Sequence, residues 1–270
     1  MKPVKILFIP LMGLIVALII LMLSYGTLGY SPTEYIRGLG EFLLKQCYNV
    51  FEKEWWAGSP EVITATLWDY RGLDTVYETT VFYLAVIGCI SVFRLLQPRL
   101  AEIAKEKEEY ALTVIVRVAT KIVLVVIILI SINIALHGHI TPGGGFQAGS
   151  AFAVAPLLAI AAFSRYFVEK MGLKMDLSHA LRSLGLIIIA LVALTPLFYF
   201  GYLLQNQAKP WSPFPGFPVE VGFLELSGSL FYFDIGEYLN VAMGFLAIFL
   251  LISLPEHVFK KDMEVVKSES

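Results

Sequence analysis

The chain has 270 residues, of which 57% are hydrophobic and only 16% are charged, and its mean hydropathy is +0.74. Soluble domains contain about 45–50% apolar and about 25% charged residues, so the composition excludes a soluble globular enzyme. The net charge of −2 argues against a nucleic-acid-binding surface. The two cysteines, Cys47 and Cys89, are too few and too far apart for a disulfide scaffold or a Cys-x-x-Cys site.

Six apolar stretches are long enough, or nearly so, to cross a hydrocarbon core of about 30 Å, which requires about 20 helical residues. They cover approximately residues 6–25, 79–96, 112–136, 148–168, 184–204 and 235–254. The first stretch exceeds the apolar region of about 7–15 residues in a signal peptide, and no convincing cleavage site follows it. The sequence therefore predicts an all-α integral membrane protein with about six transmembrane helices.

The distribution of lysine and arginine predicts the orientation of these spans. With both termini in the cytoplasm, thirteen of the twenty basic residues lie in cytoplasmic segments and five in external segments. The remaining two, Arg117 and Lys121, fall in the third span. Because basic residues concentrate on the cytoplasmic side, we expect a multi-pass protein of the cytoplasmic (inner) membrane with both termini inside.

Two external segments are longer than simple turns. Residues 26–77 include Ser31-Pro32-Thr33-Glu34, which is typical of a helix start with Ser31 as N-cap. Aromatic and apolar residues then mix with charges as far as Trp56, which predicts an amphipathic helix on the outer surface of the membrane or on a partner. Residues 205–234 contain four prolines and are expected to form an irregular loop.

The sequence GHITPGGGFQAG, residues 138–149, follows the third span. Three consecutive glycines favour a tight turn between two helices, or a backbone approached closely by a neighbouring helix or an ion. A metal site formed by His137 and His139 lacks a third ligand nearby in the sequence. A phosphate-binding loop lacks the Gly-Lys-Ser/Thr that would follow it.

This motif resembles the signature of the B subunit (MnhB) of Mrp-type multisubunit Na⁺/H⁺ antiporters, which related subunits of membrane-bound hydrogenases also carry. The sequence LFYFDIG, residues 230–236, is similar to a second part of that family's pattern. The resemblance covers approximately residues 110–258, which contain four of the expected spans. It implies a B-type subunit of an ion-translocating membrane complex.

The first half of the chain carries a second resemblance. VITATLWDYRGLDT, residues 62–75 and followed by Glu78, resembles the segment before the last helix of the Mrp A subunit. Tyr77 departs from the glycine that this family commonly has before the glutamate. The chain is thus interpreted as an A-subunit-tail-like segment with two spans, residues 1–108, joined to a B-subunit-like domain with four spans, residues 109–270. The two pieces are expected to join in the charged stretch 99–109. A fusion of this kind resembles relatives coupled to a hydrogenase or sulfane-sulfur reductase.

Lys121 is the candidate ion-pathway residue inside a predicted span, and it shares a helix face with Arg117. The uncharged run 122–136 has 15 residues, about 22 Å of helix, which is too short to cross the membrane. The span must begin earlier and so draws Lys121 below the headgroups. Lys121 then either extends back toward the cytoplasm or meets the counter-charge of a neighbouring subunit in a hydrated polar path.

The other candidates lie at the external ends of the spans. Carboxylates there suit the mouth of a cation path, and histidines, which titrate nearest neutrality, suit proton release or uptake. These candidates are Glu78, Asp234, Glu237, His137 and His139, with Asp69, Arg71 and Asp74 as a hydrogen-bonded vestibule. Local alternatives remain open for two of them: Thr75 and Glu78 match a capping box, and Asp234 is placed to cap the last helix.

The resemblance implies a non-catalytic membrane subunit of an Na⁺/H⁺ antiporter-like module, in a complex driven by redox chemistry or an existing gradient. We expect this chain to have no catalytic residues and to bind no metal or cofactor, because it lacks cysteine clusters. Iron–sulfur or nickel–iron centres would belong to partner subunits, and the expected partners are other Mrp-like subunits and a redox module. The alternatives are a stand-alone secondary cation transporter, a purely structural subunit of the same complex and, least favoured, an enzyme at the outer surface.

Overall fold

A computed structural model describes residues 3–24, 36–93, 112–204, 213–214, 216–222 and 224–254. The chain divides into two compact units, Met1–Phe42 and Leu43–Ser270. The first unit contains α1 (Pro3–Ser24), which coincides with the first predicted span. The described apolar part of α1 is Met12–Ser24, so a sixth crossing by this helix stays a prediction.

Five helices of the second unit are long and apolar enough to cross a membrane, counted over the described ranges. They are α4 (Gly72–Val92), α6 (Val114–His137), α7 (Gly145–Ala162), α9 (Met175–Phe200) and α10 (Leu230–Ile252). These helices confirm a multi-pass, mainly helical membrane protein. The orientation of the termini relative to the membrane stays a prediction.

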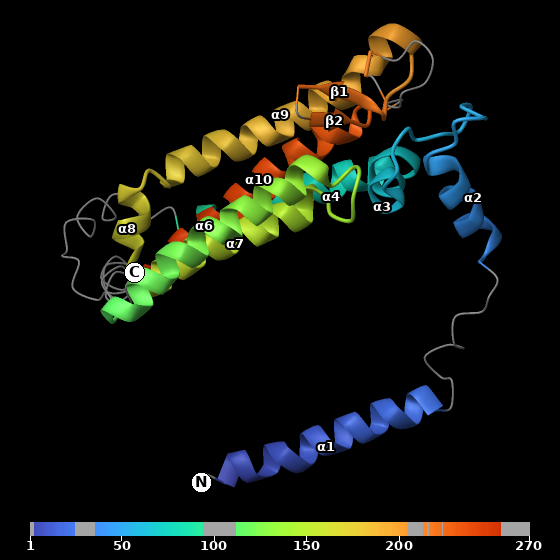
Figure 1. The fold of residues 1–270 in the computed structure, drawn as a ribbon. Coiled ribbons are helices and arrows are strands. Elements are labelled where there is room, and N and C mark those ends of the chain that lie inside the picture. Colours follow the sequence, from blue (N-terminus) through green and yellow to red (C-terminus); the bar gives the residue numbers. More distant parts are fainter. Residues whose placement is uncertain are drawn as a thin grey trace, which may run out of the picture. The chain divides into compact units, whose positions relative to one another are not determined.

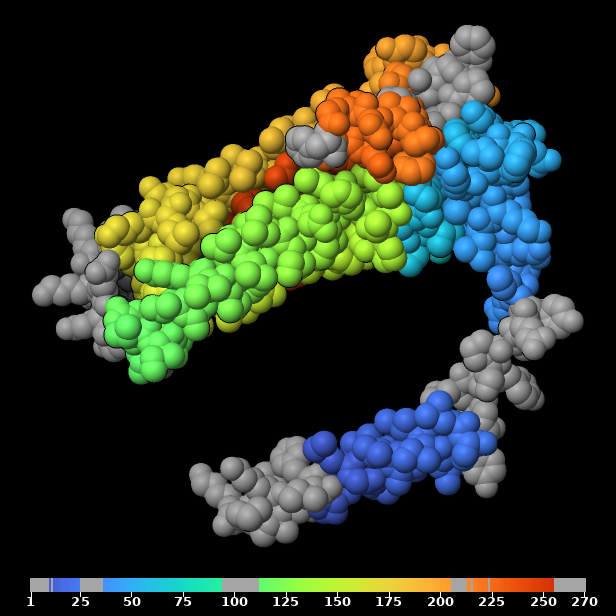
Figure 2. All heavy atoms as spheres, in the orientation of Figure 1, coloured from blue at the N-terminus to red at the C-terminus, as the bar shows by residue number. Residues whose placement is uncertain are grey.

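α10 is the central helix of the second unit and packs against α9, α7, α4 and α6. Figure 1 shows α10 between α9 and the pair formed by α6 and α7. On the face drawn in Figure 2, the surface of α10 is visible between these neighbours. Glycines permit the close approach: a Cβ added to Gly185 of α9 would lie 2.4 Å from the carbonyl oxygen of Gly236 of α10. Small residues at helix contacts are the usual means by which membrane helices pack closely.

Helix α2 (Gly38–Cys47) lies in the segment for which an amphipathic helix was expected. The predicted start at Ser31 lies outside the described residues, and the prediction that the helix extends to Trp56 is wrong. The side-chain Oδ1 of Asn49 accepts hydrogen bonds from the backbone amides of Phe51 and Glu52, each at 3.1 Å. Such a local bond competes with continuation of a helix, and Trp56 is buried in the irregular segment that follows.

The proline-rich segment before α10 contains two strands, β1 (Val219–Val221) and β2 (Leu224–Leu226). They pair antiparallel with Val219 opposite Leu226, and Gly222 at the turn has a φ of 68°. The expectation of an entirely irregular loop is therefore wrong at this hairpin, while the chain as described is mostly helical. Strands of three residues are too short to show a clear alternation of apolar and polar residues.

Three short helices complete the described fold: α3 (Val62–Ala65), the π-helical turn η1 (Thr66–Tyr70) and α8 (Arg165–Lys170). The junction predicted at residues 99–109 lies outside the described residues, so the division into 1–108 and 109–270 stays a prediction. α4, from the first predicted part, packs against α10 from the second. α4 therefore belongs to the same packed bundle as the helices of the second part.

Candidate functional site

The three sequence segments that carry the family resemblances meet at the end of the bundle where α7 and α10 begin. The hydroxyl of Thr64 donates to the carbonyl of Gly138 at 2.7 Å, and the hydroxyl of Ser59 donates to the carbonyl of His139. The indole of Trp68 stacks on Phe233, with ring centres 4.5 Å apart and an interplanar angle of 1°. Residues that are far apart in the chain, such as Trp68 and Phe233 at a separation of 165 positions, thus form one buried site.

Two carboxyl groups lie at the centre of this site. Asp234 is completely buried and Glu237 is 6% exposed, and they share one face of α10 because they are three residues apart. The backbone amide of Gly145 donates to Oδ1 of Asp234 at 3.3 Å, and the amide of Phe146 donates to Glu237. The single N–H of the Trp68 indole interacts with the two carboxyl groups. Within the described residues, Oδ2 of Asp234 is buried without a hydrogen-bond partner.

The surroundings of this carboxyl pair are acidic. Glu61, which is 6% exposed, interacts electrostatically with Asp234, and Glu78 on α4 interacts with Glu237. In the described ranges, neither member of the pair has a lysine or arginine partner, and no three His, Cys, Asp or Glu side chains are grouped to hold a metal ion. An uncompensated buried carboxylate is strongly destabilising, so a proton or a cation bound at the pair would favour its burial.

Gly145, the third glycine of the motif, allows α7 to reach the carboxyl pair. A Cβ at this position would lie 2.4 Å from the carbonyl oxygen of Asp234 and 2.7 Å from Cβ of Glu237. Both contacts are far shorter than a van der Waals separation. The absence of a side chain is therefore what lets the first amides of α7 donate to the carboxyl groups.

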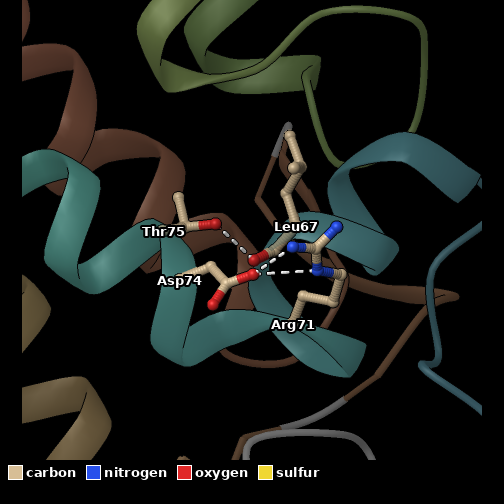
Figure 3. A network of polar contacts seen from close by, with 4 residues as sticks. All are labelled: Leu67, Arg71, Asp74 and Thr75. Atoms are coloured by element: carbon tan, nitrogen blue, oxygen red, sulfur yellow. Dashed lines mark hydrogen bonds and ion pairs between the residues drawn. The ribbon is translucent and has the colours of Figure 1, made fainter.

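The predictions that Thr75 and Glu78 form a capping box and that Asp234 caps the last helix are wrong. α4 begins at Gly72, so Thr75 lies inside the helix, and its hydroxyl donates to the carbonyl of Leu67 at 2.6 Å (Figure 3). α10 begins at Leu230, which places Asp234 in its second turn. In both cases the helix begins earlier than the apolar run indicated, and the side chain serves a tertiary contact.

The vestibule residues lie around a separate hollow. Nε of Arg71 donates to Oδ2 of Asp74 at 2.9 Å, and both side chains are mostly exposed; Figure 3 shows the pair beside the start of α4. Together with Asp69 they line a hollow of about 460 Å³. The described contacts of Asp234 and Glu237 include none of these three residues.

The two candidate histidines have different environments. His139 is completely buried, its Nε2 lies 2.8 Å from the carbonyl oxygen of Glu225, and its ring meets Phe231 edge to face at 5.3 Å. Burial lowers the pKa of His139 to about 4, so its ring is neutral at pH 7. His137 is partly exposed, and its Nδ1 lies 3.0 Å from the carbonyl oxygen of Asn133.

We expect His139 to make the folded state sensitive to acid. The unfolded chain takes up a proton at a pKa of about 6.5, whereas the folded chain resists protonation until about pH 4. Its stability should therefore fall by about 3 kcal/mol as the pH drops through this window. The measurement is the unfolding free energy against pH for the wild type and for His139→Gln, which should show a shallower decline. Parallel pH curves for the two proteins would contradict this assignment.

Lys121 lies apart from the carboxyl pair. It is sixteen residues before His137 on α6, about 24 Å along the helix. Its Nζ lies 5.9 Å from the centre of the Phe163 ring, and its side chain is exposed in this chain. A counter-charge from a neighbouring subunit stays a prediction.

Arg182 is the buried charge that the sequence interpretation missed. It is completely buried, its Nη2 donates to the carbonyl of Tyr83 at 2.6 Å, and its guanidinium lies 4.2 Å from the centre of the Tyr83 ring. Nε and Nη1 have no hydrogen-bond partner. The apolar run begins at Leu184, which placed Arg182 in a cytoplasmic segment, but α9 begins at Met175, so Arg182 lies two turns inside the helix.

The contacts between α9 and α10 place Arg182 level with Asn240. Before Arg182 on α9, the hydroxyl of Ser178 donates to the carbonyl of Met243 at 2.5 Å. After Arg182 on the same helix, a Cβ added to Gly185 would lie 2.9 Å from the amide nitrogen of Asn240. The side-chain amide of Asn240 donates to the carbonyl of Thr79 at 3.1 Å, and its Oδ1 has no partner. A polar layer thus crosses the interface of α4, α9 and α10.

Substitutions at Arg182 should separate the effect of its volume from that of its charge. Arg182→Ala leaves a cavity and is expected to reduce stability by about 2–5 kcal/mol. Arg182→Met retains most of the volume and removes a buried charge that lacks a carboxylate, so we expect a much smaller loss, or a gain. Thermal unfolding of both variants in detergent tests this expectation, and equal losses would show that the contacts with Tyr83 dominate.

Comparisons with known proteins agree on the kind of subunit. Residues 115–247 match the model of a domain related to the MnhB subunit of Na⁺/H⁺ antiporters. A putative antiporter subunit, mnhB2, of Staphylococcus haemolyticus is 32% identical over 140 residues, which are 52% of this chain and 94% of that protein. An uncharacterised protein of Methanocaldococcus jannaschii is 29% identical over 228 residues, which are 78% of this chain and 82% of that protein.

Two solved structures share the fold. One is a chain of the membrane-bound sulfane sulfur reductase, an archaeal respiratory membrane complex, with a TM-score of 0.56, 22% identity and coverage of 92% of this chain and 100% of that chain. The other is a chain of the Mrp complex from Dietzia sp., with a TM-score of 0.60, 18% identity and coverage of 95% of this chain and 26% of that chain. These two structures show the fold, and the sequence matches show the family: the chain belongs to the family of MnhB-related Na⁺/H⁺ antiporter subunits.

Proposed function

We propose that this chain is a non-catalytic membrane subunit of an Na⁺/H⁺ antiporter-type module within a redox-driven ion-pumping complex. Its role is to hold a proton or a monovalent cation at the Asp234–Glu237 pair as the ion passes between subunits. Glu78 links the pair to the exposed face of α4, because it interacts with Glu237 while its own side chain is exposed in this chain.

The observation that carries this proposal is the unpartnered Oδ2 of Asp234. That atom is completely buried, beside a second carboxyl group and near Glu61. A carboxyl group that served only to join α7 to α10 would need just the oxygen that accepts from Gly145. The remaining oxygen is available for a proton or a cation, which is the arrangement that ion-translocating membrane proteins use for intramembrane carboxylates.

The proposed partners are other Mrp-like subunits and a redox module of the hydrogenase or sulfane-sulfur reductase type. The fold shared with a chain of the archaeal reductase complex over that chain's full length supports this choice. We propose that any iron–sulfur or nickel–iron centres lie in those partners. Within the described residues both cysteines are free, with Cys47 buried and Cys89 exposed.

Isolation of the native complex tests the assignment. A tagged copy of the chain is purified in mild detergent from its own membranes, and the proteins that accompany it are identified by mass spectrometry. We expect several antiporter-like subunits together with a redox module. Antiporter subunits alone would replace the redox-driven complex with a gradient-driven exchanger. A lone chain that transports cations after reconstitution would overturn the proposal in favour of a stand-alone transporter.

A further inference from the structure

A hollow of about 380 Å³ lies between the first turns of α6 and the end of α7, remote from the carboxyl pair. Two cations, Arg117 and Lys121, line one wall. The remaining lining residues are mainly apolar and aromatic: Val114, Val118, Phe163, Ser164 and Phe167. The hollow therefore has two positive charges on one wall, and its other lining residues form a mainly apolar surface that can contact hydrocarbon chains.

The two cations have no carboxylate partner in the described part of the chain. Nε of Arg117 is buried without a hydrogen-bond partner, and the described contact of Lys121 is with the face of the Phe163 ring. The carboxylate of Glu169, on neighbouring α8, forms an ion pair with Arg165 at 2.7 Å. Among the described residues, the hollow thus presents positive charge that no carboxylate of this chain pairs with.

Both cations lie near one end of α6, a helix that is long and apolar enough to cross the membrane. α6 begins at Val114, so Arg117 and Lys121 lie about 5 Å and about 10 Å from its start. α7 ends at Ala162 at the same level, since the amide of Leu112 donates to the carbonyl of Ala162 at 3.2 Å. At the end of a membrane-crossing helix, the phosphate of a phospholipid meets basic side chains while its acyl chains meet apolar ones.

We infer that this hollow binds an anionic phospholipid, with Arg117 and Lys121 holding the phosphate and the wall formed by Phe163, Val118 and Phe167 contacting the acyl chains. Arg117 supplies directed N–H donors and Lys121 a mobile charge, a combination that suits phosphate oxygens. An anionic headgroup compensates one of the two positive charges of the site, whereas a zwitterionic headgroup, which has no net charge, compensates neither. The hollow should therefore discriminate between lipids by headgroup charge.

The test uses the complete purified complex, stripped of lipid with detergent and titrated with phosphatidylglycerol or phosphatidylcholine. Native mass spectrometry counts the bound lipids. We expect phosphatidylglycerol to bind preferentially, and the double variant Arg117→Gln/Lys121→Gln to bind it about tenfold or more weakly. Lys174→Gln, which removes an exposed lysine that does not line the hollow, serves as the matched control. Arg117→Lys/Lys121→Arg, which keeps both charges, should retain binding.

Three results would overturn the inference. Equal binding by the wild type and the double glutamine variant would place the lipid elsewhere. Equal binding of the two lipids would remove the role of the charges. Loss of a neighbouring subunit from the double variant, with lipid binding unchanged, would show that a protein carboxylate occupies the hollow. None of these results depends on ion transport, so the lipid site and the proposed function are tested separately.

Discussion

Glu237→Gln or Asp234→Asn is expected to reduce ion transport by the assembled complex at least tenfold. An amide oxygen can still accept from the backbone amides of Gly145 and Phe146, so the contact between α7 and α10 should survive. An amide cannot exchange a proton or balance the charge of a cation, so the site loses its proposed chemistry. The measurement is Na⁺-dependent proton movement in vesicles that contain the purified complex.

Glu220→Gln is the matched control for these variants. Glu220 lies on β1 and its side chain is exposed, so removal of its charge should leave transport unchanged. Normal assembly and normal transport in both carboxyl variants would show that Asp234 and Glu237 act only in packing. A failure of assembly would be separated from a failure of transport by the subunit composition of the purified complex.

Gly145→Ala is expected to destabilise the bundle by about 1–3 kcal/mol or more, as overpacked cores usually are. The added Cβ would lie 2.4 Å from a backbone oxygen of α10, and a backbone atom cannot move away as a flexible side chain can. α7 must then shift away from α10, which also breaks the hydrogen bond from the Gly145 amide to Asp234. Thermal unfolding of the purified protein reports the loss.

Gly88→Ala provides a control of the same chemistry. Gly88 lies in α4, and a Cβ there would meet nothing within 4 Å. Alanine favours a helix over glycine by about 1 kcal/mol, so this variant should be as stable as the wild type or more stable. Equal losses in Gly145→Ala and Gly88→Ala would contradict the packing argument at Gly145.

Five of the six spans and the B-subunit-like segments were evident in the sequence, because runs of apolar residues are long and glycine motifs are distinctive. The resemblance of residues 62–75 to the A subunit stays a prediction. The positions at which helices begin were less evident. α9 begins nine residues before the apolar run that starts at Leu184, because its polar first turns pack against α10 and need not be apolar. This is why Arg182 appeared to be cytoplasmic and is in fact buried.

The composition of the candidate site could be predicted only in part. Asp234, Glu237 and Glu78 were identified as acidic residues near the ends of spans, but a sequence does not show which of them face one another. Their grouping depends on the π-helical turn η1, which brings Trp68 onto α10, and on the approach that Gly145 permits. Trp68 and Asn240 act through tertiary contacts alone, so no local pattern distinguished them from ordinary core residues.

The most direct test of the central claim is infrared difference spectroscopy of the purified complex, recorded as Na⁺ is added or the pH is raised. We expect an absorption from a buried protonated carboxyl group that disappears as the proton leaves or a cation replaces it. This change should be lost in Glu237→Gln or Asp234→Asn and kept in Glu220→Gln. Identical difference spectra for the wild type and all three variants would contradict the claim that this carboxyl pair carries an exchangeable ion.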